Sequence, residues 1–254
     1  MNITPQPAAR GLLWLAEGLR LMKRQPLGLF AMTFLSIALT LLPSIIPGIG
    51  TLLTLVVQPA IYFGLMTAIK AIDEGEHPNP RLLLAAFKPE ESGNVWQPLL
   101  VLGTINAALV VCVMLVATLF AADTAPIMIS QDQPAPDPEL LTQWLQSTLI
   151  FAVLFMPVQM AMWYAPLFVG WHGTPAGKSL FFSLVAVWRN KWGFAALFIG
   201  WMAILFVLIL ILNLLVAGLG LAPALLSMMI APLTLLIISA AYCSFWVNYR
   251  DVIR

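Results

Sequence analysis

Six long apolar runs determine what this chain can fold into. Each has about 20 or more residues and no Asp, Glu, Lys or Arg, and a helix needs about 20 apolar residues to cross a bilayer. The chain is only 9% charged, whereas soluble domains carry about 25% charged residues. The runs are 27–46, 48–69, 97–121, 145–170, 193–217 and 222–246. We predict an all-α polytopic protein with six transmembrane helices, in one integral membrane domain over 1–254.

The basic residues predict the orientation of these spans. With six spans, all 12 Lys and Arg residues fall on one side, and the other side carries only acidic charges. Lys and Arg accumulate in cytoplasmic loops, so both termini are expected in the cytoplasm of a bacterium, with the protein in the inner membrane. The 12 residues are Arg10, Arg20, Lys23, Arg24, Lys70, Arg81, Lys88, Lys178, Arg189, Lys191, Arg250 and Arg254.

A short segment with basic and apolar residues precedes each pair of spans. The three segments, about 5–25, 80–88 and 175–191, each begin near Thr-Pro or Asn-Pro, which is a common helix start. Such segments are typical of amphipathic helices that lie in the membrane interface. Prolines at 59, 157 and 232 recur within the second span of each pair. We therefore expect three pseudo-repeats, each an interfacial helix followed by a hairpin of two spans.

The stretch "VWRNKWGF" at 187–194 joins the third interfacial segment to the fifth span. Tryptophan prefers the headgroup layer, and Lys or Arg beside it can meet lipid phosphates. The stretch "KRQPLGLF" occupies a similar place before the first span. We predict lipid-headgroup contacts, mainly with anionic lipid, and no nucleic-acid partner. The predicted contact residues are Arg20, Lys23, Arg24, Trp188, Arg189, Lys191 and Trp192.

Four neutral amides lie within the spans: Gln58, Asn106, Gln159 and Asn213. Two interpretations remain open. Amides can join membrane helices by hydrogen bonds, and they can satisfy carbonyls that a nearby proline leaves free. Alternatively, the four residues line a polar cleft between the repeats that admits a lipid or a small solute.

The C-terminal stretch "YCSFWVNYRDVIR" combines aromatic residues with a charged end. The aromatic residues suit the headgroup layer. We expect Arg250 and Asp251 to pair with each other or to cap the sixth span.

Reactive groups are absent from the spans, and no GxxxxGK[ST], HExxH or GxSxG motif occurs. We therefore expect no catalytic residue, no metal and no cofactor. The leading interpretation is a non-enzymatic protein with a membrane-organising or accessory role. A permease or exporter of an apolar or amphipathic solute is the first alternative. An enzyme at the interface that uses His77 and His172 is the second. A protein partner or a homo-oligomer remains open.

Three stretches of the chain carry a resemblance: "ITPQPAARGLLWLAEGLRLMKRQPLGLF", "FFSLVAVWRNKWGF" and "YCSFWVNYRDVI". Through them the chain resembles a family of six-span inner-membrane proteins of proteobacteria. The likeness covers nearly the whole chain, and its layout is similar to YciC-type proteins and to the membrane domain fused to some glycerophosphodiester phosphodiesterases. It implies a polytopic membrane fold. The family has no established reaction, and phosphodiesterase chemistry would belong to a separate soluble domain, so no catalytic residue carries over.

Overall fold

The computed structural model describes residues 2–87, 95–120, 138–219 and 223–253, and within these ranges it is all-helical with no β-strand. The elements follow one order three times, a surface helix and then a hairpin. The first unit is α1 (Arg10–Arg24), α2 (Pro26–Leu41), η1 (Leu42–Ile45) and α3 (Gly50–Asp73). The second is η2 (Pro80–Phe87), α5 (Trp96–Phe120), α6 (Pro138–Met162) and α7 (Ala165–His172). The third is α8 (Ala176–Arg189), α9 (Lys191–Leu219) and α10 (Pro223–Val252).

Six stretches of the described chain are long and apolar enough to cross a membrane, which confirms the predicted span count. Their limits agree with the predicted runs to within about ten residues. They are Pro26–Ile45, Gly50–Asp73, Trp96–Leu119, Thr142–His172, Lys191–Val216 and Ile230–Val252. The acidic loop between the third and fourth spans, together with Lys88 and Arg254, lies outside the described residues.

The start of the first surface helix was predicted wrongly. It begins at Arg10, not near Thr4-Pro5, and no side chain caps it. The preceding residues instead join distant parts of the chain: the Thr4 N–H donates to the Val252 carbonyl at 2.9 Å, and Ile3 forms a β-bridge with Ile253. Pairing with the C-terminus therefore replaces the expected first helical turn.

The other two predicted helix starts differ from each other. Asn79 caps η2, because its side-chain oxygen accepts a hydrogen bond from the Arg81 N–H at 3.1 Å. The Thr174 side chain makes no such bond, and Pro175 occupies the N-cap position of α8. There the Ser179 hydroxyl donates to the carbonyls of Thr174 and Pro175 at 3.1 Å.

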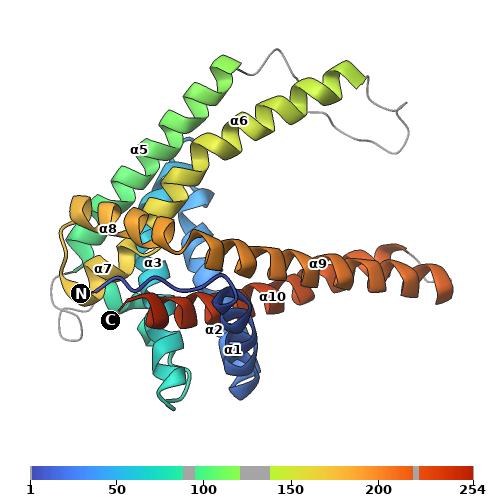
Figure 1. Cartoon of the computed structure of the whole chain (residues 1–254), viewed down its shortest axis with the longest axis horizontal. Helices are drawn as coiled ribbons and strands as arrows, with labels where there is room; N and C mark the ends of the chain where they lie inside the picture. Colours follow the sequence, from blue (N-terminus) through green and yellow to red (C-terminus); the bar gives the residue numbers. More distant parts are fainter. Residues whose placement is uncertain (1, 88–94, 121–137, 220–222, 254) are drawn as a thin grey trace.

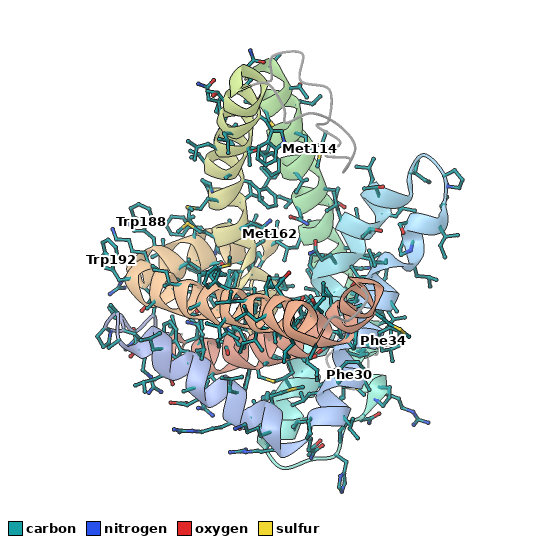
Figure 2. The ribbon with its side chains drawn as sticks, turned by 90° about the vertical axis from the view of Figure 1, so that its right-hand side faces the viewer. Phe30, Phe34, Met114, Met162, Trp188 and Trp192 are labelled. Carbon is teal, nitrogen blue, oxygen red and sulfur yellow. The ribbon has the colours of Figure 1, made fainter. Side chains whose placement is uncertain are left out.

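The three hairpins diverge from a common base. Figure 1 shows α5 and α6 rising together while α9 and α10 run to the right, and both chain termini lie at the base. In Figure 2 the α5–α6 hairpin stands upright, and the tip of the α2–α3 hairpin points to the upper right. Buried residues concentrate near the base: in α10 they lie between Ser239 and Val252. The far ends of the hairpins consequently offer apolar side chains to their surroundings.

Each surface helix packs on the second span of the preceding unit. The helix η2 lies on α3, α8 lies on α6 and α7, and α1 lies on α10, so the three units close into a ring. Glycines permit two of these approaches, since a Cβ at Gly64 would meet the Leu83 backbone and one at Gly18 would meet Ser244. The ring holds the ends of the six spans together at the base.

Candidate functional site

The α8–α9 corner presents two exposed tryptophans around one lysine. Trp188 is 61% exposed and Trp192 is 69% exposed, and both point outward in Figure 2. The Lys191 ammonium lies 4.5 Å from the Trp188 ring centroid and 5.8 Å from that of Trp192, within cation–π range. We call Trp188, Arg189, Lys191 and Trp192 the tryptophan corner.

Asn190 fixes the backbone between the two helices. Its side chain is buried, donates to the Ala186 carbonyl at 2.9 Å and accepts from the Gln6 N–H at 2.7 Å. Both tryptophans are thus held on a rigid turn. Arg189 and Lys191 are exposed and form no ion pair within the described residues, so both cations are available to an anion.

The predicted contact residues of α1 divide into two kinds. Arg20 and Lys23 are exposed and have no acidic partner in the described part of the chain. Arg24 pairs with Asp73 at 3.1 Å, although 60% of its side chain remains exposed. Arg24 is therefore partly neutralised, and the other predicted cations are not.

A charge network that the sequence did not predict joins the first unit to the third. Asp73 accepts hydrogen bonds from Arg250 at 2.8 Å and from the Trp246 indole at 3.0 Å. Glu17 pairs with Arg250 at 3.1 Å and with Arg10 at 3.0 Å. These contacts connect α1, α3 and α10 where the ring of units closes.

Asp251 completes this network. It accepts from Arg10 Nε at 2.5 Å and from the buried Trp14 indole at 2.9 Å. The hydrogen bond to Asp251 raises the pKa of the Arg10 guanidinium above its ordinary value. The expected pairing of Arg250 with Asp251 is wrong, because each binds a residue from another helix. The sequence contains no local spacing pattern that predicts these contacts between distant residues.

Three of the four predicted cleft residues meet at one cavity. Gln58, Asn106 and Gln159 line a partly open pocket of about 280 Å³ bounded by α2, α3, α5, the α6–α7 junction and α10; we call it the central pocket. The Asn106 amide donates to the Leu55 carbonyl at 3.3 Å and to the Gln58 side chain at 3.4 Å. Asn213 is exposed on α9, donates to the Ile209 carbonyl at 2.8 Å and does not line the pocket.

The central pocket lies near the middle of the spans. Asn106 follows the start of α5 by 10 residues (106 − 96), and Gln58 precedes the end of α3 by 15 (73 − 58). At about 1.5 Å per residue these positions are about 15–22 Å from the base, and the hydrocarbon core is about 30 Å thick. Of the three recurring prolines, only Pro59 lines the pocket.

A break between α6 and α7 shapes one wall of the pocket. The fourth span was predicted as one helix over 145–170, but it is interrupted at Trp163 and Tyr164. Ser183 of α8 satisfies the freed backbone: its hydroxyl accepts from the Tyr164 N–H at 2.9 Å and donates to the Met160 carbonyl at 2.8 Å. Irregular backbone in a membrane is tolerated where such partners exist. The break places Trp163 and Pro166 against the cavity.

The two histidines occupy different surroundings. His172 Nε2 lies 2.8 Å from the Tyr249 hydroxyl, and His77 is exposed in the segment between α3 and η2. Within the ranges that the structure describes, no group of three or more His, Cys, Asp or Glu residues is placed to hold a metal ion.

These features define a multi-pass α-helical membrane protein. The chain is 32% identical over 253 residues to a protein of Burkholderia thailandensis named "Probable inner membrane protein BTH_II0599", with 98% of this chain and 93% of that protein covered. The chain therefore belongs to this family of inner-membrane proteins. No family model matches the chain, and no solved structure matches it.

Proposed function

We propose that this protein is a non-enzymatic component of the inner membrane whose basic face binds anionic lipid headgroups in the cytoplasmic leaflet. Both termini lie in the cytoplasm, and the protein has a membrane-organising or accessory role. The observation that carries the proposal is the tryptophan corner, where two exposed tryptophans flank an unpaired lysine on a rigid turn. We also propose that the protein is related to YciC-type proteins.

The exposed basic side chains contribute enough electrostatic free energy to favour anionic lipids over zwitterionic ones. Each Lys or Arg near an anionic membrane surface contributes about 1 kcal/mol. Arg20, Lys23, Arg189 and Lys191 are exposed without ion-pair partners in the described ranges. Arg10, Arg24 and Arg250 are weaker candidates, because each already pairs with a carboxylate.

We expect the double variant Arg189→Gln/Lys191→Gln to retain less anionic lipid. The protein is purified from nanodiscs that contain equal phosphatidylglycerol and phosphatidylethanolamine, and native mass spectrometry counts the lipids that remain bound. The ratio of phosphatidylglycerol to phosphatidylethanolamine should fall about 30-fold, because two favourable charges that contribute about 1 kcal/mol each are lost.

Lys178→Gln serves as the matched control. Lys178 is exposed on the same helix, but among the described residues no tryptophan ring lies beside its ammonium as Trp188 and Trp192 lie beside Lys191. It therefore lacks the aromatic anchors that hold the corner in the headgroup layer, and its loss should change the ratio by less. An unchanged ratio in the double variant, or an equal effect per charge in the control, would contradict the assignment of the lipid contact to the tryptophan corner.

A second candidate function is passage of an apolar or amphipathic solute. The central pocket favours it, since three spans each contribute an amide to one cavity at the depth where transporters commonly bind substrate. The break between α6 and α7 beside that cavity resembles the discontinuous helices of such sites.

A further inference from the structure

We infer that the central pocket binds an uncharged amphiphile from the surrounding membrane, a lipid whose polar part carries hydroxyl or ester groups. The inference names a ligand class for the second candidate function, but it holds whether or not the ligand is transported. It uses none of the residues of the tryptophan corner, so it can succeed or fail independently of the headgroup proposal.

Unused hydrogen-bonding capacity is the first reason. The Gln159 amide and the hydroxyls of Tyr62 and Tyr242 line the pocket and make no hydrogen bond within the described residues. The Tyr62 and Tyr242 rings lie side by side, with centroids 6.2 Å apart. Polar groups at membrane depth are strongly disfavoured without partners. A molecule in the pocket that offers donors and acceptors would supply them.

The absence of charge from the lining is the second reason. Among the residues that the structure describes, no Asp, Glu, Lys, Arg or His lines the central pocket. A charged group at this depth would lack a counter-ion, and charges near the bilayer centre are costly unless they are paired. The polar part of the occupant is therefore neutral. Phospholipid headgroups, which carry a phosphate, fit the tryptophan corner better than they fit this pocket.

The apolar part of the lining supplies the third reason. Ile37, Leu65 and Phe245 lie beside the amides, so the pocket offers both kinds of surface to one molecule. A cluster of water would satisfy the amides but would leave these side chains against water. An amphiphile matches both, as ligand sites with a few placed polar groups in an apolar cavity usually do.

Access from the bilayer follows from the divergence of the hairpins. Met162, which lines the pocket, lies near the centre of Figure 2 between the upright α5–α6 hairpin and the helices below it. Leu41, Gln58 and Gln159 line the same pocket and are exposed. Membrane lipid therefore reaches the pocket sideways, without passing through the base.

Photolabelling tests this inference. The full chain in nanodiscs is exposed to a 1,2-diacylglycerol with a diazirine in one acyl chain, and separately to phosphatidic acid with the same labelled chain. Diacylglycerol offers one hydroxyl and two ester carbonyls without charge. We expect it to label peptides of α3 and of the α6–α7 junction, with competition by unlabelled diacylglycerol. Phosphatidic acid should label these peptides weakly.

Two variants examine the pocket in different ways. Tyr62→Phe/Gln159→Leu removes polar groups with little change of shape, and Thr40→Trp fills the cavity from α2, where Thr40 lines it. The double variant should reduce the pocket label at least about fivefold, the smallest change expected from the loss of two hydrogen bonds. Thr40→Trp should reduce the label at least as much, because the added ring occupies the cavity. Asn213→Leu removes an amide outside the pocket and should leave the label unchanged.

Equal labelling of the wild type and the double variant would overturn the inference, as would equal labelling by the two lipid probes. Label confined to the outer parts of the hairpins would also overturn it. Arg189→Gln/Lys191→Gln should keep the diacylglycerol label while losing anionic lipid. Loss of the diacylglycerol label with anionic lipid retained would contradict both the pocket and the headgroup proposal.

Discussion

Replacing Asp73 by alanine is expected to lower the free energy of unfolding by about 1–3 kcal/mol, because the change leaves the buried Trp246 indole N–H without its acceptor. Only 15% of the Asp73 side chain is exposed, and it accepts from Arg250, Arg24 and the Trp246 indole. The Arg24 side chain is 60% exposed, so its contact contributes least. Unfolding in detergent, followed by tryptophan fluorescence, measures the change.

The neighbouring carboxylate provides the control for Asp73→Ala. Glu74 is 58% exposed, and it pairs with Lys70 at 4.0 Å. Exposed pairs of this kind contribute about 0.3–0.5 kcal/mol, so Glu74→Ala should change stability little. Equal stability of the two variants would contradict the role assigned to Asp73 in joining α1, α3 and α10.

Gly103→Ala is expected to destabilise the protein by about 1–3 kcal/mol, the usual cost of overpacking. A Cβ at this position of α5 would meet the Val56 backbone carbonyl of α3, and backbone cannot rotate away as a side chain can. The two helices would have to separate. The hydrogen bond from Asn106 to Gln58, which crosses the same interface, would lengthen with them.

Gly218→Ala separates this packing effect from helix propensity. Gly218 also lies in a spanning helix, α9, but among the described residues no atom lies within 4 Å of an added Cβ. Alanine should be neutral or slightly stabilising there, since glycine in a helix is less favourable than alanine by about 0.5–1 kcal/mol. If both substitutions changed the unfolding midpoint in detergent equally, close packing of α3 and α5 would not be the cause.

Much of the architecture follows from short-range properties of the sequence. The six spans could be predicted because their length and apolar character reflect the thickness of the bilayer directly. The surface helices η2 and α8 were placed to within about two residues, since Asn79-Pro80 and Thr174-Pro175 mark nearby helix starts. Membership of an inner-membrane family agrees with that layout.

The remaining features depend on contacts between distant residues. The late start of α1 results from pairing with residues about 250 positions away, and the α6–α7 break is stabilised by Ser183 of α8. Asn213 looks like the other amides in sequence, yet α9 carries it outward from the pocket. The partners of Asp73 are set by the ring of units, in which α1 meets α10. Composition and periodicity contain no information about that closure.

Measuring which side of the membrane the basic face occupies is the most direct test of the proposed lipid contact. Starting from Cys112→Ser/Cys243→Ala, single cysteines are introduced as Ser44→Cys on η1 and Lys178→Cys on α8, both exposed positions at opposite ends of the spans. A membrane-impermeant maleimide is then applied to spheroplasts. The orientation predicts that residue 44 reacts at once and that residue 178 reacts only after permeabilisation. The opposite pattern would place the basic face in the periplasm and contradict the proposal.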